Sequence, residues 1–244
     1  MKDNSHDLEV NCSRCSLDKI CMPKGLSKDE INTLSGVVKQ KRILQRGEFI
    51  YRQGDNFKGV LAIQSGMAKL VIDDQSGNEH ILSILLPGEL LGFDGLHDVH
   101  YCSAIALNTL NFCELPKDKV DDLCRRLPTL THELFKHSSN ILKESQARVI
   151  STKLPGDQKI ATFLLDLSDR FKQRGFSAIT FRLPLSRSEI GNHLGLAIET
   201  VSRLLQQFQQ KGLVSINQKE VKILNFAELR RTAQNDNDES IHFR

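Results

Sequence analysis

Short β-rich apolar runs separated by glycine turns characterise residues 41–115 of the chain. Among these runs are GVLAI, AKLVI and SAIAL. The sequences RGE at 46–48 and QGD at 53–55 are candidate tight corners, and DDQSGN at 73–78 is a candidate hairpin tip. Regular turn signals between short strands predict a β-sandwich or jelly roll over this segment.

Helical patterns flank this β-rich segment. Ser27 is a candidate N-cap with Glu30 at the capping-box position, which predicts a short helix within 27–39. A second short helix is expected over 117–127, ending before Pro128, and a long helix over about 130–152. PG at 155–156 then breaks the pattern and indicates a domain boundary. Residues 1–23 are polar without an amphipathic period, so a loop or arm is expected there.

The long helix carries apolar residues at roughly heptad spacing, namely Leu134, Ile141, Leu142 and Val149. Such a seam can pair with a second copy of the chain, which makes this helix the predicted dimer interface. The alternative is that the same residues pack on the β-rich domain of their own chain.

After residue 157 the sequence predicts a helix, the short strand FRLPL, a pair of helices and the hairpin VSINQKEVKILN. Ser186 can cap the first helix of the pair, with Glu189 at the capping-box position, and Gly195 allows a tight turn before the second helix. This length and spacing predict a helix-turn-helix with a following wing. Residues 230–244 are polar, and a frayed tail is expected there.

One face of the second helix carries side chains that suit DNA bases. Glu199, Ser202 and Arg203 stand at positions i, i+3 and i+4, so they share a face. Arg can bond guanine in a bidentate manner, Glu can accept from cytosine, and Ser can bond or touch a thymine. Arg187 and Thr200 complete the predicted DNA-binding set. The alternative is a solvated face with an internal Glu199–Arg203 ion pair.

Four of the six cysteines form a candidate metal site. Cys12, Cys15 and Cys21 have the spacing C-x2-C-x5-C, and Cys113 lies at a strand end far along the chain. Four thiolates suit a 4Fe–4S cluster, and they also suit a closed tetrahedral zinc site. Cys102 and Cys124 are expected to be small buried hydrophobes, with Cys124 as the alternative to Cys113 for the fourth ligand.

Bulk properties narrow the class of protein. A length of 244 residues suits about two domains. The net charge of +3 means that any DNA-binding charge must be local. No apolar run reaches the roughly 18 residues of a membrane span, and the N-terminus has no apolar signal core, so we expect a cytoplasmic protein without membrane contact. No nucleotide-binding, Walker, serine-hydrolase or zinc-protease motif is present, so no enzyme is expected.

The segment RFKQRGFSAITFRLPLSRSEIGNHLGLAIETVSRLLQQFQQKGL resembles the DNA-binding domain of the fumarate–nitrate reduction regulators. These are oxygen-sensing members of the cyclic-AMP receptor protein superfamily. The resemblance covers about residues 12–229, and its specific motifs are the ETVSR recognition helix and the cysteine quartet.

The resemblance implies an α+β protein with several parts. These are a cysteine-bearing arm (1–26), a β jelly-roll sensor domain of the cyclic-nucleotide-binding type (27–127), a dimerisation helix (128–154), a winged helix-turn-helix (155–229) and a polar tail (230–244). It also implies one 4Fe–4S cluster per chain on the four cysteines. A homodimer would read inverted TTGAT-type repeats in double-stranded DNA, with Glu199, Ser202 and Arg203 contacting bases. The tip at 73–78 would contact RNA polymerase, and the regulator would control anaerobic gene expression by activation or repression.

The chain departs from its relatives at three places. Arg14 lies between the first two cysteines, where the family tends to have an acidic or other polar residue. Ser145 stands where the family commonly has an aspartate that opposes dimerisation without the cluster. Residues 87–104 resemble the phosphate-binding turn of cyclic-nucleotide pockets, but Cys102 replaces the arginine before Ser103, so no cyclic-AMP site is expected. A zinc-stabilised or small-ligand-responsive regulator of the same superfamily is the alternative function.

Overall fold

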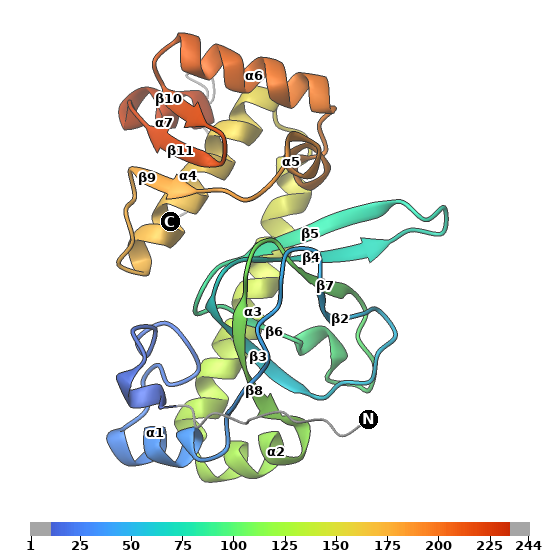
Figure 1. Cartoon of the computed structure of the whole chain (residues 1–244), viewed down its shortest axis with the longest axis vertical. Coiled ribbons are helices and arrows are strands. Elements are labelled where there is room, and N and C mark those ends of the chain that lie inside the picture. The colour runs from blue at the N-terminus through green and yellow to red at the C-terminus, as the bar shows by residue number, and fades with distance from the viewer. Residues whose placement is uncertain (1–10, 235–244) are drawn as a thin grey trace. The chain divides into compact units, whose positions relative to one another are not determined.

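The computed structural model describes residues 11–234 of the chain. The chain forms two compact units, Met1–Glu144 and Ser145–Arg244, whose boundary falls inside the long helix α3 (Pro128–Ser151). Residues 1–10 of the predicted arm and 235–244 of the predicted polar tail lie outside the described residues. The expected α+β architecture, with a β-roll and a helix-turn-helix, is confirmed, and Figure 1 shows its elements in chain order.

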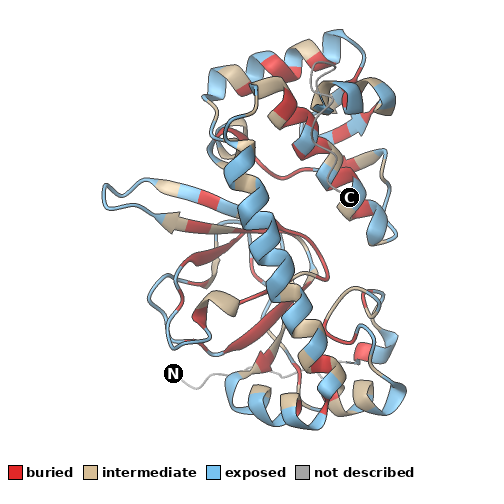
Figure 2. Ribbon diagram, turned by 180° about the vertical axis from the view of Figure 1, so that it is seen from behind, coloured by how far each residue is buried: buried red, intermediate tan, exposed pale blue. Residues whose placement is uncertain are grey.

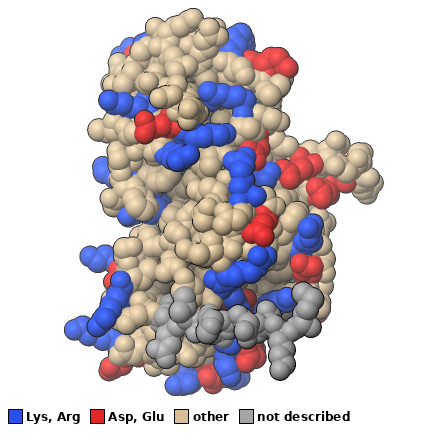
Figure 3. All heavy atoms as spheres, viewed as in Figure 1, with Lys and Arg blue, Asp and Glu red and all other residues tan. Residues whose placement is uncertain are grey.

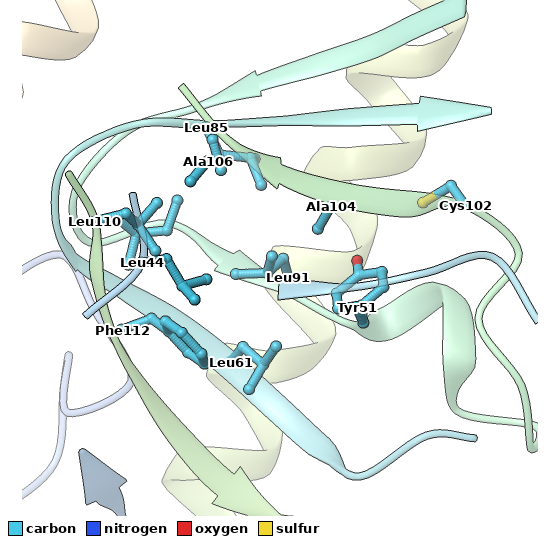
Figure 4. Close-up of a cluster of buried hydrophobic side chains, with 12 residues drawn as sticks. Leu44, Tyr51, Leu61, Leu85, Leu91, Cys102, Ala104, Ala106, Leu110 and Phe112 are labelled. Carbon is cyan, nitrogen blue, oxygen red and sulfur yellow. The ribbon is translucent and has the colours of Figure 1, made fainter. Parts of the chain in front are cut away.

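Within residues 11–144 the first unit holds two antiparallel sheets of four strands each, ordered β1-β8-β3-β6 and β2-β7-β4-β5. Leu44, Leu61, Leu91, Leu110 and Phe112 belong to the core that both sheets share, and Figure 4 shows these side chains. The strands are β1 (Lys39–Gln40), β2 (Phe49–Tyr51), β3 (Gly59–Ser65), β4 (Ala68–Asp73), β5 (Glu79–Leu85), β6 (Leu90–Leu91), β7 (Ser103–Ala106) and β8 (Asn111–Pro116).

The predicted corners and hairpin tip of this roll are confirmed. Gly47 and Gly54 have φ values of 85° and 86°, in the left-handed region that glycine adopts without strain. The tip at 73–78 joins β4 to β5, which pair from Asp73↔Glu79 to Ala68↔Leu85.

A second apolar cluster joins the helices of this unit to the roll. It contains Met22, Leu34, Leu115, Leu123 and Leu130. Leu34 comes from α1 (Lys28–Ser35), where Ser27 and Glu30 form the predicted capping box, and Leu123 comes from α2 (Lys117–Arg126). The α1 helix lies within the predicted range 27–39, and the chain enters β1 at Lys39.

The described part of the predicted loop or arm contains buried apolar residues. Leu17 and Met22 are each only 3% exposed. These two residues follow no helical period, so the sequence pattern does not predict their burial. The chain there runs through the 3-10 helix η1 (Cys12–Arg14) and a series of tight turns.

Helix α3 is exposed along most of its length, as the pale ribbon in Figure 2 shows. Leu134, which the sequence assigned to the dimer seam, instead packs against the core cluster of the first unit. Its neighbour Phe135 is 72% exposed and precedes Leu142 and Val149 at intervals of seven residues, with exposures of 60% and 70%. The exposed heptad stripe is therefore Phe135, Leu142 and Val149.

The second unit contains α4 (Gly156–Gln173), α5 (Arg187–Leu194) and α6 (Ile198–Gln210), followed by the expected wing hairpin β10 (Val214–Asn217) and β11 (Glu220–Ile223). Strand β9 (Thr180–Arg182) pairs with β11, which completes a small antiparallel sheet. The chain continues into α7 (Phe226–Gln234), so residues 230–234 are helical rather than part of a frayed tail. Fully buried Leu229 explains the difference, because α7 packs on α4.

Candidate metal centre and nucleic-acid interface

Cys12, Cys15, Cys21 and Cys113, the four predicted ligands, line one cavity of about 160 Å³ in the first unit. Arg14 lines the same cavity. The fold thus brings a distant strand residue to the N-terminal C-x2-C-x5-C segment. Among the described residues, the remaining cysteines Cys102 and Cys124 are not part of this lining.

Backbone turns and helix α1 position the three N-terminal cysteines. The Cys12 N–H donates to the Ser35 hydroxyl at 3.2 Å, and that hydroxyl donates to the Ile31 carbonyl. The Cys15 N–H donates to the Cys12 carbonyl at 3.3 Å, and the Cys21 N–H donates to a carbonyl one turn earlier at 2.9 Å. The segment is therefore fixed by its own hydrogen bonds and by α1.

Cys113 stands inside β8, between two neighbouring strands. Gln40 of β1 and Ala62 of β3 are its register partners, and both also line the cavity. Because side chains alternate along a strand, Cys113 faces away from its neighbour Phe112, which lies in the core of the roll. The sheet thus presents the fourth thiol to the cavity that the three N-terminal cysteines line.

Burial makes these thiols resist ionisation. It raises the pKa of Cys21 and of Cys113 to about 12, and the neighbouring thiols add to the shift in each case. The pKa of Cys12 is also raised by burial, while the hydrogen bond with Ser35 opposes the shift. Four thiolates held together here would repel one another in a poorly solvated space. A cationic metal group would compensate that charge, so the donor set fits a thiolate-bound metal centre.

Within residues 11–234, no group of three or more His, Cys, Asp or Glu side chains is arranged to hold a metal ion. The four thiols line one cavity, and four cysteine ligands suit either a tetrahedral zinc ion or an iron–sulfur cluster.

In the second unit, the helix-turn-helix has the predicted local structure. Ser186 and Glu189 form the capping box at the start of α5, with hydrogen bonds of 3.1 Å and 2.7 Å. Gly195 ends α5 with φ 64°, as the tight turn requires. Gly191 was not predicted: a Cβ there would lie 2.5 Å from the Leu196 carbonyl oxygen, so only glycine lets the turn close on α5.

The predicted reading face of α6 is exposed. Glu199, Ser202 and Arg203 are all accessible, while Val201 and Leu204, which alternate with them, are buried. The three residues belong to the first two turns of α6, the helix that follows α5 in Figure 1. The N-terminal end of a recognition helix is the end that enters the major groove in complexes of this motif.

Arg187 and Thr200, the other two predicted DNA-binding residues, are half-buried rather than exposed. Arg187 is half-buried and lines a cavity of about 310 Å³ with Gln218 and Lys219 of the wing, and desolvation lowers the pKa of its guanidinium. Thr200 is half-buried, with its methyl group near the backbone of Gly156. Their predicted contact with DNA stays a prediction.

A β-roll of this topology followed by a winged helix-turn-helix defines a class of transcription regulators. Residues 41–127 match the family model of the cyclic nucleotide-binding domain, and residues 158–232 match that of the Crp-like helix-turn-helix domain. The structure of FixK2 from Bradyrhizobium japonicum shares the fold, with a TM-score of 0.74 at 22% identity over 80% of this chain and 97% of that one.

Full-length relatives define the family more closely. The transcriptional activator protein Anr of Pseudomonas aeruginosa is 44% identical over 91% of each chain. The fumarate and nitrate reduction regulatory protein of Vibrio cholerae is 38% identical, over 92% of this chain and 90% of that protein. The chain belongs to this family of DNA-binding transcription regulators.

Among the helices of residues 11–234, none combines the length and the apolar character that crossing a bilayer demands.

Proposed function

We propose that this protein is an oxygen-responsive transcription regulator. Cys12, Cys15, Cys21 and Cys113 would hold one 4Fe–4S cluster per chain, and the homodimer would bind inverted TTGAT-type repeats in DNA while the cluster is intact. The regulator would control anaerobic gene expression in the cytoplasm. The observation that carries this proposal is the convergence of these four thiols on one cavity.

The bound cluster would supply an oxygen-reactive group and, through ligation, part of the folding free energy of the arm. The chain's own residues then connect the arm to the dimerisation helix. Gly25, four residues after Cys21, lies against Thr129 and Glu133 of α3, whose side-chain atoms are 3.7 Å and 3.8 Å from the position of a Cβ at residue 25. The side chain of Thr129 also lies close enough to Glu30 of α1 to help lower the pKa of its carboxyl, after the larger effect of Ser27.

These contacts give a physical route for the response. Binding of the metal group by Cys12, Cys15 and Cys21 would fix the turns between these residues. The same segment ends at Gly25, which lies against the first two turns of α3. Loss of ligation would leave buried thiols and turns without their cross-link, so the support of α3 would weaken. Because α3 carries the exposed heptad stripe, dimerisation and DNA binding would weaken with it.

A zinc-stabilised regulator is the second candidate, favoured by the four-thiol donor set alone. The two candidates differ in the metal found and in acid-labile sulfide. Iron, zinc and sulfide should therefore be measured in protein purified without oxygen. We expect iron and sulfide in equal amounts, about four of each per chain for a 4Fe–4S cluster. Zinc without sulfide would contradict the proposal.

Cysteine variants assign the ligands. Replacing Cys12, Cys15, Cys21 or Cys113 by serine should abolish the iron content of anaerobic protein. Cys102→Ser and Cys124→Ser are matched controls, because their thiols lie outside the cavity lining within the described chain. Wild-type iron in Cys113→Ser, or its loss in Cys124→Ser, would overturn the assignment.

A further inference from the structure

A single carboxylate in the β-roll is surrounded by hydrogen-bond donors. Asp94 lies in the 3-10 helix η2 (Phe93–Gly95). Its Oδ2 accepts from the backbone N–H groups of Tyr101 and Cys102 at 3.0 Å and 3.2 Å. Its Oδ1 accepts from the Tyr51 hydroxyl at 3.1 Å, and the His100 Nδ1 is 3.3 Å from both oxygens. The side chain is only 20% exposed.

The walls of this site are tightly packed. The His100 ring is stacked on Tyr51 with centroids 3.6 Å apart, and it meets Phe57 edge-on at 6.0 Å. A Cβ at Gly95 would lie 2.8 Å from the His100 ring, so this ring rests directly on bare backbone. Figure 4 shows Tyr51 and Cys102 at the edge of the apolar core. The donors are therefore held in place by packing that does not depend on the carboxylate alone.

Successive backbone N–H groups that converge on one point form an anion-binding concavity. Here the two amides belong to the segment just before Ser103, inside the stretch that resembles the phosphate-binding turn of cyclic-nucleotide pockets. The anion they bind comes from the chain itself. Without an acceptor these partly buried donors would carry a desolvation cost.

We infer that the Asp94 carboxylate is a built-in anion that occupies the anion-binding site of the β-roll. The sensor domain therefore completes its fold without a small-molecule anion, in contrast to a roll whose turn awaits a phosphate. The inference predicts a latent site: once the Asp94 side chain is removed, the Tyr101 and Cys102 amides and the Tyr51 hydroxyl bind a small free carboxylate. Asp94 has this role whichever metal group the cysteines hold.

Chemical rescue tests the inference in the full-length chain. Asp94→Ala should lower the melting temperature, and sodium acetate should restore part of the loss, because a ligand that binds only the folded state raises stability with its concentration. Sodium chloride at the same ionic strength is the salt control. Asp98→Ala is the matched variant, because this carboxylate of the same loop is 86% exposed and pairs only loosely with Lys117 at 3.6 Å. Wild type and Asp98→Ala should respond to acetate and chloride alike.

A second readout locates the bound acetate. In the Asp94→Ala variant, the amide resonances of Tyr101 and Cys102 should shift on acetate titration, whereas in wild type they should not. Should Asp94→Ala fail to fold, Asp94→Ser provides the same comparison with a smaller loss of polarity. Acetate that stabilises the variant no more than wild type, or that shifts amides elsewhere, would show that Asp94 merely ties down its loop. Iron content plays no part in either readout, so the outcome is independent of the cysteine experiments.

Discussion

At the scale of single residues, the chemistry of α6 depends on three exposed side chains supported by buried neighbours. Arg203 is exposed on α6, and Glu199 lies one turn before it, so the alternative of an internal Glu199–Arg203 ion pair stays open. Both side chains are accessible to base edges in a major groove.

Arg203→Ala should weaken binding to a cognate TTGAT-type operator by about 1–3 kcal/mol, because a bidentate contact with guanine is lost. The loss should be much smaller at operators in which that base pair is changed. Lys211→Ala, at the C-terminal end of the same helix, is the control, since an exposed lysine that meets a phosphate weakens all sequences alike and lowers the salt slope by about one unit. Titrations on a set of operators separate the two patterns. Equal weakening at every operator by Arg203→Ala would make it a phosphate contact.

The cavity thiols make metal loading dependent on pH. Because the pKa of Cys21 and of Cys113 is raised to about 12 in the folded, metal-free chain, both are protonated at neutral pH and must release protons on ligation. A raised pKa also affects the stability of the metal-free fold relative to the unfolded chain. The contribution of the protonated thiols to this stability is fully present below the ordinary thiol pKa and is lost as pH rises toward the raised pKa. Anaerobic loading should therefore become more favourable with rising pH throughout the range from about pH 6.5 to about pH 8.5, because this range lies well below the raised pKa and each thiol must still release its proton. The measurements are iron content and proton release in weak buffer.

Cys102→Ser is the control for this pH dependence, since the Cys102 thiol lies beside Asp94 rather than among the cavity residues. It should leave the proton release unchanged. Loading that is independent of pH would mean that the cysteines are already ionised before the metal arrives.

Single residues also show where sequence reasoning succeeds. Ser27–Glu30 and Ser186–Glu189 were predictable because a capping box is a local pattern with a fixed spacing. The role of Asp94 was not, because its donors come from residues 51 and 100–102, which only the folded roll brings together. The half-burial of Arg187 against the wing has the same cause.

At the scale of elements, α3 shows how packing decides which side of a helix is free. Leu134 and Phe135 are adjacent and both apolar, so the sequence cannot tell which one faces the core. The cluster around Leu130 takes up Leu134, and the 100° step between neighbours turns Phe135 outward. For the same reason the helical continuation at 230–234 was missed, since buried Leu229 anchors a helix that continues through the mainly polar residues 230–234.

The exposed stripe predicts the dimer seam. Leu142→Glu would place an unpaired charge at the middle of a paired helix, at a cost of several kcal/mol, so the anaerobic protein should sediment as a monomer. Asn140→Glu is the matched control, because this exposed residue lies two positions earlier and faces nearly the opposite way. A dimer in both variants would place the seam elsewhere, and a monomer in both would indicate a general effect of charge on α3.

At the scale of the whole molecule, a regulator that activates transcription needs a surface for polymerase besides its DNA-reading face. The β4–β5 hairpin projects from the roll, and Figure 3 shows acidic side chains along it. Its two tip aspartates have different surroundings. Asp74 accepts hydrogen bonds from the Ser76 and Asn78 N–H groups and lies 3.0 Å from His80, and this bonding lowers the pKa of its carboxyl. Asp73 is exposed at the end of β4.

Asp73→Lys should therefore reduce activated transcription while leaving operator binding and the melting temperature unchanged, because it reverses a surface charge without removing a bond that holds the tip. Asp74→Lys should lower activation and also destabilise the hairpin tip, since it removes the carboxylate that accepts the hydrogen bonds closing the turn. Asp121→Lys, an exposed charge reversal on α2 of the same unit, is the control and should leave transcription intact. Transcription in vitro with purified polymerase, beside operator titration, gives both quantities. Full activation by Asp73→Lys would show that the hairpin is a plain solvated turn, and equal loss of activation in Asp121→Lys would show a response to net charge rather than to a contact at the tip.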